Sequence, residues 1–392
     1  MRVLVVTDWP ALEAGTERYV ELVVDGLRRQ GDEVRLMTSS AGSAADGTAD
    51  YVAYGTDVRA AQAGLQVVNP SAVTTLRRAL REFRPDAVHL TIFMPHLSPA
   101  ILAPLRDVRT VLMVMDYKPV CMNSMRLRRD GSDCDEPAGA VCWQGGCVSL
   151  PHYLRDRARY RMMRTGMAQV GAVGTISGWM AAVLDQAGID ARPLALPVAR
   201  VGARYERRRA PVPTFVFGGR FAPVKGVDVL LRAFALVREQ RPDAQLRLYG
   251  DGPDAIDLMG LAEDLGLQRA VEWNVGMVPA WADRIGDAWA LVAPSVFREP
   301  LGLVAIEGIV RGVPVIASDG GGFRETVEPG VSGSLVRSGD PGALADAMLA
   351  VAERPFDVPD EMVESMRLRH DPDVHARALR ELLAPAQAVV PA

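Results

Sequence analysis

The sequence has 392 residues, 49% hydrophobic and 23% charged, which is typical of a soluble globular protein with room for two α/β domains. Its formal net charge of −4 leaves no overall positive field and argues against a nucleic-acid partner. No apolar run reaches the about 18 residues of a transmembrane helix, and a strand-like segment at 2–7 leaves no room for a signal peptide. We therefore expect a cytoplasmic protein without a transmembrane segment, compatible with peripheral contact at the inner face of a membrane.

The first part of the chain alternates β-rich and helical segments. The sequence predicts a strand at 2–7, an amphipathic helix at about 16–30 and a strand at 33–38. Further strands are expected at 87–92, 109–116 and 169–176. Strands separated by helices indicate βαβ units, and hence a parallel sheet covered on both faces.

A proline-rich stretch at 192–213 predicts a linker between two domains. Beyond it, helices are expected at about 226–239, 254–265 and 302–311, and strands at 214–219, 244–250, 270–275, 288–294, 313–318 and 333–336. We therefore expect an N-terminal Rossmann-like acceptor domain at 1–200, a C-terminal Rossmann-like donor-nucleotide domain at 201–365, and a terminal helix and tail at 366–392.

A loop-rich insert at 117–150 breaks this rhythm, and it contains the chain's four cysteines: Cys121, Cys134, Cys142 and Cys147. Disulfides are disfavoured in a reducing compartment, so four clustered thiols indicate a structural, tetrahedral Zn²⁺ site. The spacing lacks a C-x-x-C pair, which leaves buried or unpaired thiols and disulfides as alternatives. The five histidines are scattered and form no ligand pattern.

The segment at 154–164 predicts a helix rich in arginine: Arg155, Arg157, Arg159, Arg161 and Arg164. A solvated basic face is the simplest interpretation. Contact with an anionic membrane surface or an acidic acceptor is the alternative.

The strongest chemical pattern is the block at 298–325, in which Glu299 and Glu307 flank the start of a predicted helix. Backbone N–H groups of Leu301, Gly302 and Leu303 lie at that helix start, where the helix dipole favours an anion. Carboxylates beside such an anion pocket suit a ligand whose hydroxyls flank a phosphate. The alternative is that one glutamate is a helix-terminal charge and the other a solvated side chain.

A second block follows the predicted strand at 214–219, where Gly219 and Arg220 lead to Lys225 at the start of a helix. Of the 44 basic residues only Lys118 and Lys225 are lysine, so a lysine here indicates a need for a compact ammonium. Ligands of open α/β sheets bind at the carboxyl ends of strands, where two cations would neutralise a diphosphate. A pair of surface charges in a loop is the alternative.

Two weaker signals are glycines that could let a backbone approach a phosphate. Gly250 ends a predicted strand in the turn YGDGP, and Gly15 precedes the first helix. The first loop lacks G-x-G-x-x-G, which argues against a dinucleotide cofactor.

From Phe215 to about Val336 the chain resembles the retaining glycosyltransferases of family 4. The matching segments, in order and spacing, are GGRFAPVKG, YGDGP, APSVFREPLGLVAIEG and GVPVIASDGGGFRETVEPGVSGSLV. The resemblance implies the GT-B architecture: two Rossmann-like, doubly wound domains facing across a cleft, with the C-terminal helix crossing back to the first domain.

The resemblance also implies roles for four charged side chains. Arg220 and Lys225 are expected to contact the diphosphate of a donor. Glu299 is expected to hold hydroxyls of the transferred sugar, and Glu307 to bind the ribose. The resemblance implies a nucleoside-diphosphate sugar as co-substrate. Catalysis in similar proteins retains the anomeric configuration and needs no metal. The only metal expected is therefore the structural zinc.

Backbone groups complete the donor site that the resemblance implies. They belong to Gly15, Gly219, Gly250, Leu301, Gly302 and Leu303. On the acceptor side we expect Asp116 and Tyr117. The sequence departs from similar proteins at Met115, where many carry histidine before the aspartate, and at Ala14, where a glycine pair is usual.

We predict transfer of a hexose-type sugar, with retention, to an acceptor that is a small molecule, a lipid carrier or a glycan. One alternative is a sugar-nucleotide epimerase of the same architecture, which would act on the donor without any acceptor. A non-catalytic partner subunit is the other. A phosphorylase of this architecture is disfavoured because it needs pyridoxal phosphate on a lysine, and only two lysines are present.

Overall fold

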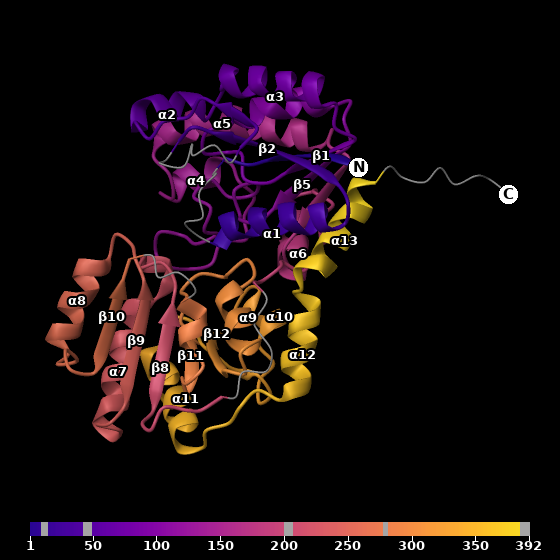
Figure 1. Ribbon diagram of the computed structural model, residues 1–392. Coiled ribbons are helices and arrows are strands. Elements are labelled where there is room, and N and C mark those ends of the chain that lie inside the picture. The colour runs from indigo at the N-terminus through magenta and orange to yellow at the C-terminus, as the bar shows by residue number, and fades with distance from the viewer. Residues whose placement is uncertain (9–14, 42–48, 200–206, 277–280, 385–392) are drawn as a thin grey trace. The chain divides into compact units, whose positions relative to one another are not determined.

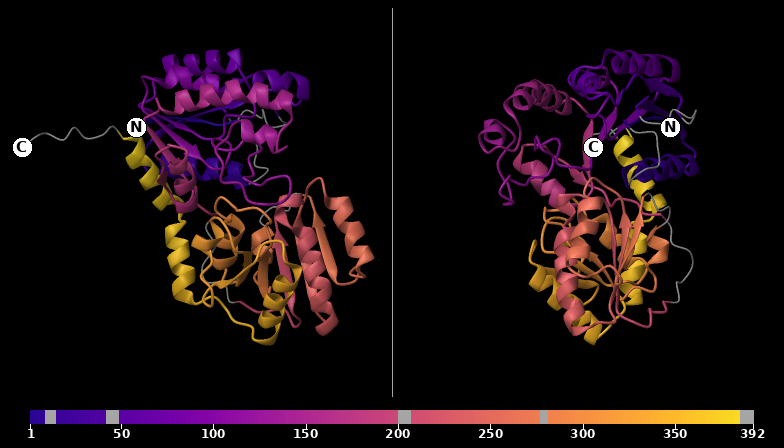
Figure 2. Two further views of the ribbon diagram at one scale, coloured as in Figure 1. Left: turned by 180° about the vertical axis from the view of Figure 1, so that it is seen from behind. Right: turned by 90° about the vertical axis from the view of Figure 1, so that its left-hand side faces the viewer.

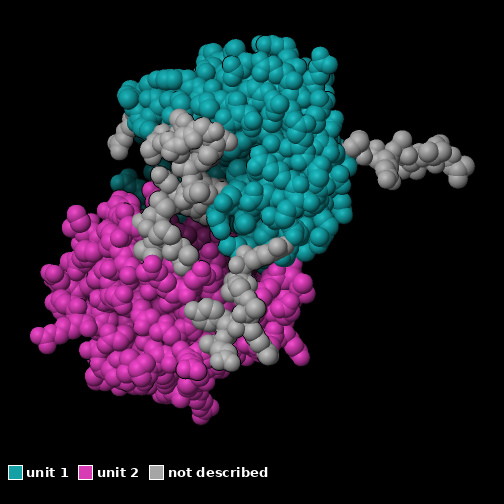
Figure 3. Space-filling view, in the orientation of Figure 1, with its two compact units in different colours: residues 1–199, 370–392 teal, residues 200–369 magenta. Residues whose placement is uncertain are grey.

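The computed structural model of the chain describes residues 1–8, 15–41, 49–199, 207–276 and 281–384 (Figure 1). The chain divides into two compact units, which are coloured separately in Figure 3. Unit 1 consists of Met1–Ala199 and His370–Ala392, and unit 2 of Arg200–Arg369. The last segment of the chain therefore belongs to the same unit as the first.

Unit 1 is built on a parallel sheet with the strand order β3-β2-β1-β4-β5-β6-β7. Its strands are β1 (Arg2–Val6), β2 (Glu33–Ser39), β3 (Tyr51–Ala53), β4 (Ala87–Leu90), β5 (Thr110–Val114), β6 (Ala172–Thr175) and β7 (Arg192–Pro193). Its helices are α1 (Gly15–Arg29), α2 (Arg59–Leu65), α3 (Pro70–Phe83), α4 (Ala140–Gln144), α5 (Leu150–Met167), α6 (Gly178–Gln186) and α13 (Pro372–Leu383), with the 3₁₀ turn η1 (Pro99–Leu105).

The sheet of unit 1 lies between two helical layers. Figures 1 and 2 show α3 and α5 on one side of it and α1 and α13 on the other. All residues of Val3–Val6, Ala87–Leu90 and Thr110–Val114 are buried, without the alternation of a half-exposed sheet. Continuous burial is what a parallel sheet covered on both faces requires, so this prediction is confirmed.

Unit 2 repeats the same topology with the strand order β10-β9-β8-β11-β12-β13, all pairs parallel. Its strands are β8 (Thr214–Gly218), β9 (Gln245–Gly250), β10 (Val271–Val275), β11 (Ala290–Ala293), β12 (Val315–Ser318) and β13 (Gly333–Val336). Its helical elements are η2 (Pro223–Lys225), α7 (Val227–Gln240), α8 (Ala255–Asp264), η3 (Trp281–Arg284), α9 (Leu303–Ile309), α10 (Phe323–Thr326), α11 (Pro341–Glu353) and α12 (Asp360–Arg369). Both orders are that of a doubly wound Rossmann-like sheet.

Three helices start with the same local device, an Asn or Asp cap followed by proline. The side chain of Asn69 accepts a hydrogen bond from the N–H of Ala72 at the start of α3. Asp340 does the same for α11, and Asp371 for α13. The proline at the first helical position has no N–H to leave unsatisfied, so cap and proline together set where each helix begins.

The predicted linker at 192–213 is wrong at its start. Arg192–Pro193 forms the edge strand β7 beside β6, and the next alternate apolar residues, Leu194 and Leu196, are buried in unit 1. Proline is tolerated on an edge strand because its missing N–H faces away from the sheet. The alternate apolar residues after Pro193 indicate an extended, half-buried segment, whereas the high proline content of 192–213 favours a linker. Residues 200–206 lie outside the described ranges.

The arginine-rich helix is confirmed as part of α5, but its predicted solvated face is wrong at one position. Arg159 is buried, and its guanidinium donates to the carbonyl oxygen of Met94 at 2.9 Å. Asp156 of the same helix lies 3.6 Å from it. Arg157, Arg161 and Arg164 are exposed as expected. No helix in the described ranges has the length and apolar character needed to cross a bilayer.

The terminal helix α13 packs against α1 within unit 1 through buried polar contacts. The hydroxyl of Tyr19 lies 3.1 Å from Nε2 of His89 and 3.2 Å from Nε2 of His375. Nδ1 of His375 donates to the carbonyl of Ala195 at 2.8 Å, because only a protonated ring nitrogen can face that oxygen. The neutral ring then accepts from Tyr19 through Nε2. This chain of contacts ties the end of the sequence to its first helix.

Burial fixes the charge state of both histidines. It lowers the pKa of His89 from 6.5 to about 3 and that of His375 to about 4. The unfolded chain takes up these protons first, so this contribution to stability is present above pH 6.5 and is lost as the pH falls toward 4. We expect the ring resonances of His89 and His375 in NMR spectra to stay unchanged between pH 7.5 and 5.5. A midpoint of about pH 6 or higher for either ring would contradict the buried, neutral network.

Candidate active site

The described site residues of unit 2 gather where the strand order of its sheet reverses. The chain leaves β8 in one direction and leaves its neighbour β11 in the other, so the loops at their carboxyl ends diverge. Ligands of doubly wound sheets bind in the crevice that this switch point creates. Lys225 follows β8, and Glu299 follows β11.

The structure brings these two side chains into direct contact. Nζ of Lys225 lies 2.6 Å from Oε1 of Glu299. The hydroxyl of Ser295 donates to the same carboxylate oxygen at 2.6 Å. Glu299 is buried, Lys225 is partly exposed, and its ammonium lies 5.5 Å from the ring centre of Phe297. A buried carboxylate with an ammonium and a hydroxyl donor is held in one orientation.

Backbone contacts hold the two loops together beneath this ion pair. The N–H of Val296 donates to the carbonyl of Val224 at 2.9 Å. Gly226 has a φ of +65°, and a Cβ built there would lie 2.1 Å from the carbonyl oxygen of Pro294. Only glycine permits both this backbone conformation and this approach. The glycine after Lys225 thus sets how near the lysine comes to the β11 loop.

We expect Gly226→Ala to destabilise the protein by about 1–3 kcal/mol, since it adds both a strained φ and a clash with backbone. Thermal or urea unfolding would measure the loss. Gly260→Ala is the matched control, because a Cβ at Gly260 on α8 meets no atom within 4 Å, and there we expect no loss of stability. Equal unfolding midpoints for the two variants would contradict the steric argument.

The glycine-rich segment after β12 holds the backbone of Glu299 in place. The N–H of Gly322 donates to the carbonyl of Glu299 at 2.8 Å. Gly302, with a φ of +80°, caps α9 and packs on the ring of Phe323, where a Cβ would lie 2.4 Å from ring atoms. Leu301 and Gly302 are buried and Leu303 is the first residue of α9. The predicted helix at 302–311 is shorter in the structure, ending at Ile309.

Glu307 lies in the second turn of α9, as predicted, and is half-buried. Burial raises the pKa of its carboxyl group from 4.5 to about 7, against the opposing effect of Arg311. Arg311 itself is paired with Asp283 at 2.6 Å. Glu307 can therefore both donate and accept hydrogen bonds near neutral pH, which suits a ligand that carries hydroxyls.

Arg220 and the two flanking glycine turns form the other side of the β8 loop. The Arg220 side chain is exposed. The N–H of Gly219 donates to the carbonyl of Tyr249 at 2.9 Å, and a Cβ at Gly250 would lie 1.8 Å from the carbonyl oxygen of Gly219. These contacts join the ends of β8 and β9, so Gly219, Arg220 and Gly250 share one edge of the sheet with Lys225.

Sequence reasoning missed Ser295 and Asp8, two polar residues that directly follow buried strands. Ser295 orients Glu299, as described above. Asp8 is fully buried after β1 and accepts from the N–H groups of His96 and Leu97 at 2.9 and 2.8 Å. It thereby joins the loops after β1 and β4, at the switch point of unit 1. Burial raises the pKa of Asp8 to about 7. Polar residues just after buried strands lie at the edge of the sheet where ligands bind, so their positions in the sequence could have identified both.

The predicted acceptor-side residues lie after β5 in unit 1. The Asp116 carboxylate is partly exposed and lies 3.5 Å from Nζ of Lys118. Tyr117 is fully buried, and its hydroxyl accepts from the indole of Trp179 at 2.7 Å. Gly15 is the first residue of α1, while the preceding loop at 9–14, with Ala14, lies outside the described residues.

Two protein-family models match this chain, one in each of its two units. The model of the glycosyl transferases group 1 matches residues 206–369, and the model of the glycosyl transferase 4-like domain matches residues 14–198. The D-inositol 3-phosphate glycosyltransferase of Nocardia farcinica is 38% identical over 165 residues, which are 40% of this chain and 36% of that protein. The one of Streptomyces griseus is 35% identical over 193 residues, 46% of this chain and 39% of that protein. These matches thus span less than half the length of the curated relatives.

Solved structures share the fold over nearly the whole chain. Sucrose-phosphate synthase from Thermosynechococcus elongatus is similar with a TM-score of 0.72 at 20% identity, over 97% of this chain and 98% of that one. Anabaena HepE in complex with UDP and glucose is similar with a TM-score of 0.68 at 16% identity, over 98% and 99%. Two parallel Rossmann-like sheets of this kind define the GT-B glycosyltransferase fold.

The chain belongs to the group 1 glycosyltransferases, the GT4 type, to which both family models point. The predicted membership of this family is confirmed.

Proposed function

We propose that the protein transfers a hexose-type sugar from a nucleoside-diphosphate sugar to an acceptor hydroxyl with retention of anomeric configuration. The observation that carries the proposal is the ion pair of Lys225 and Glu299 at the switch point of unit 2. One partner is a cation suited to a diphosphate, the other a carboxylate suited to sugar hydroxyls. A sugar nucleotide presents both groups side by side. The similar HepE structure is a complex with UDP and glucose, which makes UDP-glucose the first donor to test.

In the proposed reaction the bond between the anomeric carbon and the diphosphate oxygen breaks, and the acceptor oxygen bonds to that carbon on the same face. The acceptor proton passes to the departing diphosphate. Arg220 and Lys225 stabilise the negative charge that grows on the leaving oxygen, which is where fixed cations contribute most. No metal is needed, because the two side chains supply the positive charge.

Within the donor site we assign Glu299 to the sugar hydroxyls and Glu307 to the ribose. Backbone groups approach the sugar and phosphates, from Gly15, Gly219, Gly250, Leu301, Gly302 and Leu303. Ser295 holds the orientation of Glu299. On the acceptor side Asp116 is the group with an accessible carboxylate, while the buried Tyr117 would position the loop that carries it.

Calorimetry with UDP, GDP and ADP, and then with their glucose conjugates, tests the donor site. We expect one nucleoside diphosphate to bind to the wild type and to Arg232→Ala, a variant on the exposed face of α7, and to bind more weakly to Arg220→Ala. No binding of any nucleotide to the wild type would overturn the proposal.

Product analysis tests the reaction. The donor is incubated with three classes of acceptor: phosphorylated polyols, a lipid carrier and oligosaccharides. D-inositol 3-phosphate is the first polyol to test, because the curated relatives are D-inositol 3-phosphate glycosyltransferases. NMR of the product should show the anomeric configuration of the donor. An inverted product would contradict retention. An epimerised sugar nucleotide formed without any acceptor would show an epimerase instead.

A further inference from the structure

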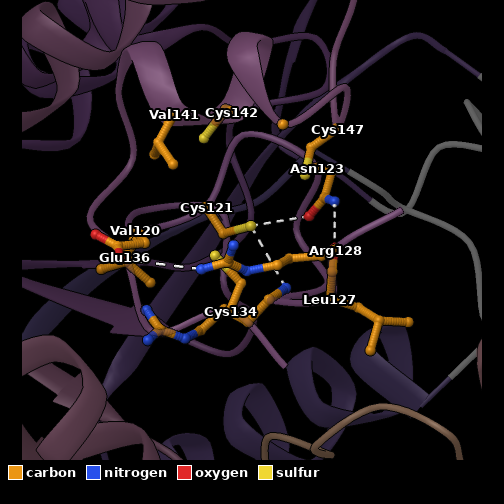
Figure 4. A pocket seen from close by; sticks show the side chains of 12 residues that line it. Val120, Cys121, Asn123, Leu127, Arg128, Cys134, Glu136, Val141, Cys142 and Cys147 are labelled. Carbon is orange, nitrogen blue, oxygen red and sulfur yellow. Dashed lines mark hydrogen bonds and ion pairs between the residues drawn. The ribbon is translucent and has the colours of Figure 1, made fainter. Parts of the chain in front are cut away.

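The cysteine-containing insert between β5 and α5 encloses a small cavity that the proposed reaction does not use. All four cysteines line it, although they come from separate turns of the segment at 117–150 (Figure 4). The structure records all four as free thiols. The cavity measures about 30 Å³, which is room for one or two water molecules or one metal ion and too little for a metabolite. Its contents must therefore be small.

The four cysteines line the same cavity, where Cys121 and Cys142 are buried and Cys134 and Cys147 are partly buried. Four thiolates around one cavity would repel one another without a cation between them. A divalent ion reverses this balance, because it binds each thiolate and releases the protons.

The backbone already presents donors to two of the sulfurs. The N–H of Arg126 points at Sγ of Cys121 at 3.4 Å, and the N–H of Arg129 donates to the sulfur of Cys147. Hydrogen bonds of this kind support thiolates that bind metals. The thiol of Cys121 also donates to the side-chain oxygen of Asn123 at 2.8 Å, and metal binding would release that proton.

The basic side chains at the cavity do not exclude a cation, because each is paired with an acid. Arg126 lies 3.1 Å from Asp135, and Arg128 lies 3.9 Å from Glu136. Their positive charges are offset by these carboxylates. Besides the cysteines and these charged groups, the lining includes the apolar side chains of Val120, Leu127 and Val141 and the amide of Asn123.

The insert contains little regular secondary structure. Between 117 and 150 its regular structure consists of the short helix α4 and an isolated bridge between Leu127 and Asp133. Among the described residues, no group of three or more His, Cys, Asp or Glu side chains is already arranged closely enough to hold a metal ion. The sulfurs must therefore move inward, which rotation of cysteine side chains in a loop-rich segment allows. In a loop-rich segment with little regular structure, a bound metal can supply folding free energy.

From these observations we propose that Cys121, Cys134, Cys142 and Cys147 bind one Zn²⁺ ion, which closes the insert as a structural site. Four thiolates in tetrahedral geometry are the ligand set that zinc prefers in closed structural sites. The ion takes no part in sugar transfer, so its test does not depend on the proposed function.

The test uses the full chain, expressed with added zinc and purified without chelator. Plasma emission should find one zinc per chain. Because the chain has no other cysteine, an organomercurial that titrates the four thiols should release that zinc, seen with a metal-sensitive dye. Cys134→Ser and Cys147→Ser should lose the zinc, whereas Ser132→Ala, an exposed position in the same insert, should keep it. If a cysteine variant fails to fold, cobalt exchanged into the wild type should give the visible bands of a tetrahedral thiolate complex.

Four outcomes would overturn the site. They are four freely reactive thiols without bound metal, a disulfide detected by mass, iron with inorganic sulfide in place of zinc, and zinc that persists in both cysteine variants. Donor binding measured in parallel keeps this result separate from the glycosyltransferase proposal.

Discussion

Lys225→Ala is expected to lower kcat for sugar transfer by about 10²–10³-fold, the loss typical when one preorganised donor to a developing negative charge is removed. The ammonium of Lys225 lies at the switch point of unit 2 and contacts Glu299. In the proposed reaction it meets the leaving diphosphate, where charge grows in the transition state. Release of nucleoside diphosphate, followed by chromatography, measures the effect. Binding of the free nucleoside diphosphate should weaken as well, because that ligand carries the same charge.

Two further variants separate this effect from damage to the fold. Lys225→Arg keeps the charge but not the compact ammonium, and we expect intermediate activity. Arg232→Ala removes an exposed charge from α7 and should behave as wild type. Because Lys225→Ala leaves the buried Glu299 without its cation, thermal unfolding must accompany the kinetics. A folded Lys225→Ala variant with near-normal turnover would show that the lysine has no part in transfer.

Glu299→Gln is expected to lower kcat/KM by about 10–10²-fold, which corresponds to one charge-assisted hydrogen bond of about 1.5–3 kcal/mol. The glutamine keeps the volume and can still accept from Ser295, but it loses the charge that orders sugar hydroxyls. The decisive measurement is a difference in binding. The variant should bind the free nucleoside diphosphate as well as wild type does, and the sugar conjugate less well.

Glu328→Gln provides the matched control, because Glu328 is an exposed glutamate of the same unit. It should change neither binding nor turnover. If Glu299→Gln weakened the free nucleotide and its sugar conjugate equally, Glu299 would act on the phosphates or on the fold, and its assignment to the sugar would fail. Lys225→Ala and Glu299→Gln thus test two different parts of one ligand.

Much of the architecture follows from local patterns in the sequence. The buried strand at 214–218 is a short apolar run that ends in glycine, and a helix follows it after a short loop. The helix that carries Glu307 was identified from its flanking glycine and its apolar spacing. The scarcity of lysine in the sequence makes Lys225 a candidate site residue. These features were predictable because they depend on neighbours within a few residues.

The errors have a common physical origin in long-range packing. The edge strand at Arg192–Pro193 exists because β6 offers it a partner, which the local proline content does not reveal. Arg159 is buried where its guanidinium can donate a hydrogen bond to the carbonyl of Met94, 65 residues away. Propensity describes a segment alone, whereas burial depends on what the rest of the chain places against it.

The sequence by itself determined the fold class, the family and the charged residues expected at the site. Tertiary structure decided that Lys225 and Glu299, 74 residues apart, form one ion pair, that Ser295 orients it, and that four scattered cysteines line one cavity. The reason is that residue type and local periodicity can be recognised within a short segment of the sequence. Contact between distant loops arises only when parallel strands bring their carboxyl ends to the same edge of a sheet.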